Sequence, residues 1–126
     1  MTAHTMYQSE IDESKNFLTV SYTGIVDDQQ TARCAKECEV AVQKLRAGFR
    51  LLTDLSGLER MDLACVPSMK RMMDLCDKAG VDLVVRVIPD PHKDIGLNIL
   101  SLFHYRKRVR IITCQTLDEA RKILAT

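Results

Sequence analysis

Apolar and polar residues alternate over two short stretches at the start of the chain. Residues 7–12 and 17–22 follow this pattern and are separated by a polar link, which predicts two antiparallel strands joined as a hairpin. The apolar positions that come next recur every three or four residues, as they do in a helix. Asp27 and Asp28 can cap that helix at its start, and Gly48 can close it.

The middle of the chain predicts a strand, a helix and a second strand. Residues 49–55 form a compact apolar run that Ser56 and Gly57 end, so we expect a buried strand that leads into a turn. Residues 66–79 repeat their apolar positions at helical spacing. Residues 81–88 are almost continuously apolar and β-branched, which is typical of a strand covered on both faces in a parallel sheet.

The last third repeats the alternation of helix and strand. Asp94 can cap a helix over residues 95–106, and a strand follows at residues 109–114. Thr116 and Glu119 have the spacing of a capping box for a final helix. The order β-β-α-β-α-β-α-β-α predicts an α/β fold, in which a mostly parallel sheet of about five strands has an antiparallel first strand and carries four helices.

Length and charge narrow the range of functions. With 126 residues and 46% apolar positions, the chain suits a single domain over residues 1–126. The net charge of +1 excludes a strongly charged binder, but residues 1–31 carry five acidic side chains against one Lys, and residues 86–110 carry six Lys and Arg against two Asp. Without an apolar run of about 20 residues or a signal region, we expect a soluble cytoplasmic protein. Five cysteines without close pairing predict buried thiols in a reducing compartment.

The segment from Phe49 to Asp62 carries a family resemblance. A strand that ends in Asp-Leu-Ser-Gly at residues 54–57 and is followed by a helix-opening Asp62 resembles the STAS-like superfamily of anti-sigma-factor antagonists, also called SpoIIAA-like. Residues 90–105 are most similar to stand-alone bacterial SpoIIAA-like proteins, which are related in fold to the Sec14/CRAL-TRIO lipid-binding domains. The resemblance spans roughly residues 7–124 and implies the SpoIIAA-like fold.

The resemblance also implies a function, with one departure. The antagonists bind a protein kinase that is also an anti-sigma factor, and they are switched by phosphorylation of a Ser or Thr directly after the helix-opening Asp. In this chain Leu63 follows Asp62, so the acceptor is missing and the phosphorylation switch is not implied.

Ligands of parallel α/β sheets gather beyond the carboxyl ends of the strands, and we predict a partner-docking edge there. A carboxylate pair at this edge could instead carry out acid–base chemistry. In a third interpretation, these residues only shape turns and cap the next helix, and the alternatives stay open. The candidate residues are Asp54, Ser56, Asp62, Asp90 and His92.

The predicted helix over residues 95–106 carries a second apolar stripe away from its sheet-facing side, followed by a cluster of positive charge. We predict contact with an apolar or lipid ligand and with an anionic membrane surface. The stripe could also be wedged between neighbouring elements, and the cations could serve the negative end of the helix dipole. The candidate residues are Met69, Met72, Met73, Leu97, Leu100, His104, Arg106, Lys107, Arg108 and Arg110.

The leading hypothesis is a non-enzymatic module that binds an apolar or lipid ligand and meets anionic membrane peripherally, at the inner face. The alternative is a regulatory protein-interaction module that lacks the phosphorylation acceptor. We predict no catalytic residue, metal ligand or cofactor, because no glycine-rich phosphate loop occurs and no further ligand accompanies Cys34 and Cys38. Nucleic acid is not an expected partner, since Tyr105 is the only aromatic residue of the basic tract, whereas a homodimer is a further option.

Overall fold

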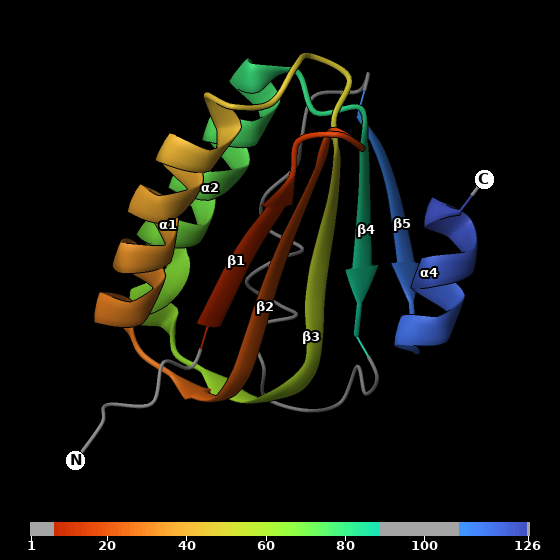
Figure 1. The fold of residues 1–126 in the computed structure, drawn as a ribbon. Coiled ribbons are helices and arrows are strands. Elements are labelled where there is room, and N and C mark those ends of the chain that lie inside the picture. The colour runs from red at the N-terminus through yellow and green to blue at the C-terminus, as the bar shows by residue number, and fades with distance from the viewer. Residues whose placement is uncertain (1–6, 89–108, 126) are drawn as a thin grey trace.

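A five-stranded sheet forms the middle layer of the computed structural model, which describes residues 7–88 and 109–125 (Figure 1). The strands lie side by side in the order of the sequence, and only the first pair is antiparallel. This confirms the predicted mostly parallel sheet with an antiparallel first strand. The strands are β1 (Tyr7–Asp12), β2 (Phe17–Val26), β3 (Arg50–Met61), β4 (Leu83–Val87) and β5 (Arg110–Cys114).

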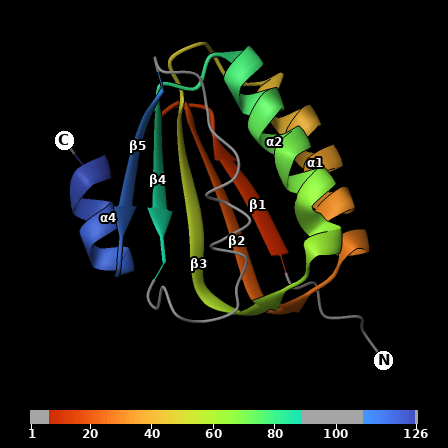
Figure 2. The ribbon, with the colours of Figure 1, turned by 180° about the vertical axis from the view of Figure 1, so that it is seen from behind.

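Helices cover both faces of the sheet. Figures 1 and 2 show α1 (Asp28–Val42) and α2 (Val66–Ala79) on one face and α4 (Leu117–Leu124) on the other. The described residues therefore hold three α-helices, and the predicted count of four is not confirmed. The third predicted helix, residues 95–106, lies outside the described residues.

Short-range chemistry sets the helix ends as the sequence predicts. The Asp27 carboxylate accepts a hydrogen bond from the Gln30 N–H at 2.9 Å and caps α1. The Thr116 hydroxyl accepts one from the Glu119 N–H at 3.2 Å and caps α4. Gly80 ends α2 with φ 93°, in the left-handed region that favours glycine.

Two apolar cores lie on the two faces of the sheet. The larger core packs α1 and α2 on the sheet around the fully buried Tyr22 and Phe49. The smaller core packs Ala120 of α4 on Val85 and Val87 of β4. Among residues 7–88 and 109–125, α4 contacts β3, β4 and β5 and no helix lies over β1 and β2 on this face, where polar side chains of those two strands line a groove.

The central strand β3 is longer than the sequence predicts. We expected a turn at Ser56 and Gly57, and this prediction is wrong, because β3 continues through both residues to Met61. Two register shifts, between residues 21 and 23 and between residues 24 and 25, keep β2 paired to it over this extra length. A Cβ on Gly57 would lie only 2.8 Å from Thr23 Cγ2, so the glycine allows close strand pairing and does not mark a turn.

The extra length produces a projecting feature, which we call the ribbon. It comprises residues 23–26 of β2 and 57–61 of β3, which pair with each other beyond Asp54, where the pairing of β3 with β4 stops. Figure 1 shows β3 curving away beyond the end of β4 toward the start of α2. The ribbon ends in a single 3-10 turn, Leu63–Cys65, that leads directly into α2.

Candidate functional site

Two exposed aliphatic side chains lie at the end of the ribbon. Leu63 is 72% exposed and Ile25 is 62% exposed. Val26 pairs with Met61, and the Cys65 thiol donates a hydrogen bond to the Val26 carbonyl at 3.6 Å, so both side chains lie at the same end of the sheet. Isolated exposed aliphatic residues are common on protein surfaces, and here two of them lie at one end of the sheet.

Two carboxylates lie near Cys65, at the same end of the sheet as this pair. Burial raises the pKa of the Cys65 thiol, and the nearby carboxylates of Asp62 and Asp28 add to the rise. Both Asp residues are exposed, and the Asp62 side chain makes no capping hydrogen bond, although the Cys65 N–H bonds to the Asp62 carbonyl at 3.0 Å. The predicted side-chain cap of the second helix is therefore absent, and Cys65 occupies the position before α2. We call Ile25, Asp28, Asp62 and Leu63 the ribbon tip.

The structure divides the predicted docking edge. Asp54 and Met61 pair with Ser21 and Val26, five residues apart on β2, so they lie about 17 Å apart, and Asp62 follows the last residue of β3. Asp54 pairs in register with Ser21 and Val87 in the body of the sheet, where its carboxylate accepts a hydrogen bond from the Ser56 N–H at 2.9 Å. Ser56 is exposed on the strand between the two carboxylates. The remaining members of this edge, Asp90 and His92, lie outside the described residues.

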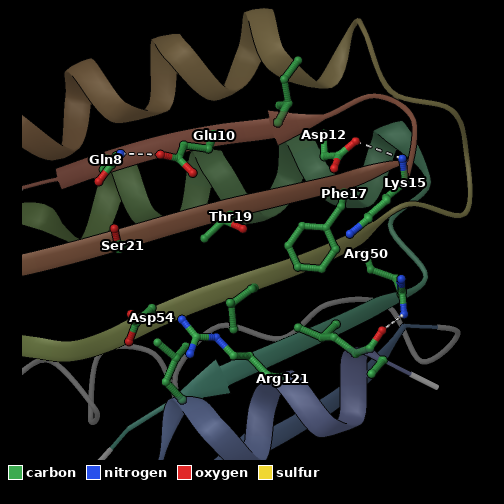
Figure 3. A pocket seen from close by; sticks show the side chains of 15 residues that line it. Gln8, Glu10, Asp12, Lys15, Phe17, Thr19, Ser21, Arg50, Asp54 and Arg121 are labelled. Carbon is green, nitrogen blue, oxygen red and sulfur yellow. Dashed lines mark hydrogen bonds between the residues drawn. The ribbon is translucent and has the colours of Figure 1, made fainter.

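Asp54 faces an open groove of about 680 Å³ that the sequence did not indicate (Figure 3). Strands β1, β2 and β3 form its floor and α4 forms one wall. In Figure 3 the Arg121 guanidinium extends from α4 toward Asp54. Three acidic and three basic side chains balance each other in a lining of Gln8, Glu10, Ile11, Asp12, Lys15, Phe17, Thr19, Ser21, Arg50, Leu52, Asp54, Leu117, Arg121, Leu124 and Ala125.

One cation of the groove has a structural role. The Arg50 guanidinium donates a hydrogen bond to the Leu124 carbonyl at 2.7 Å and lies 5.8 Å from the centre of the Phe17 ring. A cation at the last carbonyls of a helix satisfies groups that have no partner within the helix and complements the helix dipole. Arg50 therefore holds the end of α4 against the central strand.

Comparison with known proteins identifies the fold. No protein-family model and no curated protein matches the sequence. The solved structure of the unphosphorylated anti-sigma factor antagonist SpoIIAA superposes with a TM-score of 0.63 at 16% identity, over 94% of this chain and 97% of that chain. The fold is SpoIIAA-like.

Two further structures agree with this assignment. An uncharacterised protein with a SpoIIAA-like fold from Shewanella loihica gives a TM-score of 0.69 at 12% identity, over 98% of both chains. A putative anti-sigma factor antagonist from Thermotoga maritima gives 0.62 at 16% identity, over 96% of both chains. The predicted fold resemblance is confirmed, and at such low sequence identity the comparison shows the fold alone.

The methionines predicted to meet an apolar ligand are core residues of this SpoIIAA-like fold. Met69, Met72 and Met73 are 3%, 8% and 7% exposed, and the Tyr22 hydroxyl donates a hydrogen bond to the Met72 sulfur at 3.6 Å. The cavity beside them measures about 30 Å³, which is room for about one water molecule. Ligand contact by these methionines stays a prediction.

The five cysteines are buried, as predicted. A hydrogen bond from the Cys38 thiol lowers the pKa of Cys34, and the same bond raises the pKa of Cys38. Burial raises the pKa of Cys76 to about 12. Over residues 7–88 and 109–125, no three His, Cys, Asp or Glu side chains come together as a metal-binding group.

Most of the predicted membrane surface cannot be placed. Of its basic residues, Arg110 alone belongs to the described part of the chain, where it is exposed and forms an ion pair with Asp82 at 3.3 Å. Leu97, Leu100, His104, Arg106, Lys107 and Arg108 lie outside it. Within the described ranges, no helix has the length and apolar character needed to cross a bilayer.

The exposure of Ile25 and Leu63 at one end of the sheet was not predicted from the sequence. One signal was present, because an aliphatic residue directly after Asp62 stands where the family resemblance implies a polar acceptor. Ile25 gave no comparable signal, since its exposure depends on the length of the ribbon.

Proposed function

We propose that this protein is a non-enzymatic regulatory module that docks a protein partner at the ribbon tip without a phosphorylation switch. The observation that carries the proposal is the 72% exposure of Leu63 directly after Asp62. A leucine there cannot be phosphorylated, and its exposed side chain suits a permanent apolar contact.

The energetics favour docking through this surface. Full burial of a Leu or Ile side chain contributes about 1.5–3 kcal/mol relative to exposure. Because Leu63 and Ile25 keep 72% and 62% of their surface in water in this chain, most of that stabilisation is still available to a partner. Asp28 and Asp62 beside them favour a partner that carries basic side chains around an apolar pocket, since complementary rim charge speeds association and selects the partner.

The comparisons support the class of partner. The solved structures that share this fold include proteins described as anti-sigma factor antagonists, and antagonism of this kind works through protein binding. They give no support to lipid binding. The cavity of about 30 Å³ beside the methionines is far smaller than an acyl chain, and the groove of about 680 Å³ is lined by six charged side chains.

A quantitative pull-down from cells that naturally produce the protein tests this proposal. The variants are Leu63→Asp and, as the matched control, Val40→Asp, because Val40 is 57% exposed but lies near the far end of α1. We expect the wild type and Val40→Asp to recover the same stoichiometric protein, and Leu63→Asp to recover at least tenfold less, since a charge would replace an apolar contact. Equal recovery by Leu63→Asp, or no stoichiometric partner for the wild type, would contradict the proposal.

A further inference from the structure

The last strand of the sheet exposes apolar side chains on both of its faces. Within the described residues, β5 pairs with β4 alone, so it is an edge strand. Its residues 110–113 are all exposed, and Ile111 and Ile112 keep 38% and 36% of their surface in water. Successive residues of a strand point to opposite faces, so neither face of β5 is fully covered.

The other edge of the sheet is protected differently. Every second residue of β1 is exposed, and these residues are Gln8, Glu10 and Asp12, two of them charged. Charged side chains on an edge strand discourage pairing with another chain. The only charged residue of β5 is Arg110 at its start, and Ile111–Cys114 hold neither a charge nor a proline, which are common protections of an edge strand. It is thus the edge suited to pairing.

We propose that β5 pairs in antiparallel orientation with β5 of a second copy of this chain, so that two five-stranded sheets join across a two-fold axis at Ile112. A two-fold interface must be self-complementary, because the same surface is presented by both copies. An antiparallel strand pair meets this condition, since each strand offers the other the same backbone groups. In this register Ile112 lies opposite Ile112 of the second copy, and Ile111 lies opposite Thr113.

Charge complementarity favours this orientation. Antiparallel pairing puts the start of one β5 next to the end of the other, and α4 begins three residues after that end. The start of β5 carries Arg110, whose side chain is 68% exposed and pairs with Asp82 of its own chain at 3.3 Å. The first turn of α4 carries Asp118 and Glu119, and the Asp118 side chain is 88% exposed. The two-fold axis therefore brings a cation of each copy toward two carboxylates of the other.

The size of the contact predicts a weak dimer. Stable protein interfaces bury about 1,200–2,000 Å² in total, and one five-residue strand pair with its flanking side chains buries less. We expect a monomer–dimer equilibrium that shifts with concentration in the micromolar range. This inference is independent of the proposed function, because β5 and the ribbon tip share no residue.

Sedimentation equilibrium of the full chain, together with cysteine cross-linking, tests the proposal. Opposed residues of an antiparallel pair have Cα atoms about 4.5–5.5 Å apart, within the range of a disulfide, so Ile112→Cys is expected to cross-link to its own copy under mild oxidation. The native cysteines are all buried and give little background. The control is Ile25→Cys, which is also exposed but lies on the ribbon.

The expected results are a concentration-dependent dimer for the wild type, a dimer at least tenfold weaker for Ile112→Lys and an unchanged dimer for Ile25→Lys. Ile112→Cys should cross-link in more than half of the protein and Ile25→Cys should not. Far-UV circular dichroism verifies that both Lys variants are folded. A wild type that stays monomeric at hundreds of micromolar, a dimer that Ile112→Lys leaves intact, or equal cross-linking at position 25 would overturn the proposal.

Discussion

Gly57 provides the sharpest test of the paired ribbon. Substitution by Ala would place its Cβ 2.8 Å from Thr23 Cγ2 and 3.5 Å from Thr23 Cβ, against a favourable carbon–carbon separation of about 3.5–4.0 Å. Thr is β-branched and therefore stiff at χ1, so relief requires an unfavourable rotamer or a shift of the strands. Overpacking of this kind costs about 1–3 kcal/mol. The lower end applies here, because Thr23 is exposed and can move toward solvent.

A double-mutant cycle separates this clash from other effects of the substitution. Gly→Ala at an unstrained position stabilises a protein by about 0.4–1 kcal/mol through the unfolded chain, and Gly57 is not among the glycines with positive φ. Gly57→Ala should therefore destabilise the wild type by about 0.5 kcal/mol, because the gain offsets about half of the clash, and stabilise the Thr23→Ala variant by about 0.5 kcal/mol. Urea unfolding followed by circular dichroism measures both free energies. The same change in both backgrounds would refute the pairing of Thr23 with Gly57.

Three further predictions concern the rest of the fold. Burial raises the pKa of the Cys76 thiol from 9.0 to about 12 in the folded chain, so between pH 8 and 10 this thiol ionises in the unfolded chain only. The free energy of unfolding should therefore fall by about 1.4 kcal/mol over this range. Urea titrations of Cys76→Ala should lack this part of the pH dependence. Arg50→Met should leave the Leu124 carbonyl without its donor and cost about 1–2 kcal/mol, with faster amide exchange in α4 than in α1; uniform exchange would count against the anchoring role. Thr116→Ala should cost about 1 kcal/mol and Thr116→Ser almost nothing, and an equal loss in both would exclude the cap.

Local chemistry made much of the fold predictable. The caps at Asp27 and Thr116 depend on side chains that bond within three residues, and the hairpin depends on the alternation of β1 and β2. The parallel strands follow from the alternation of helical and strand periods along the chain. Each of these features depends on residues that are close together in the sequence.

The end of β3 could not be predicted in this way, because pairing between distant segments decides it. Ser56 and Gly57 have the local preferences of a turn, yet the β2 strand pairs alongside them and extends β3 to Met61. The same extension places Asp62 beyond the end of the ribbon and Asp54 in the body of the sheet, so the predicted docking edge is divided between two places. The helical spacing of the apolar residues at positions 69–76 indicated the buried face of α2. The same spacing is expected whether that face packs on the protein core or on a ligand.

Site-specific photo-crosslinking at position 63 tests the central claim most directly. A photoreactive amino acid replaces Leu63 in one sample and Val40 in the control sample, both in cells that naturally produce the protein. We expect a discrete adduct with one protein at position 63, which excess unlabelled wild type displaces, and no such adduct at position 40. The absence of an adduct at position 63, or the same adduct at both positions, would contradict the claim that the ribbon tip docks a partner.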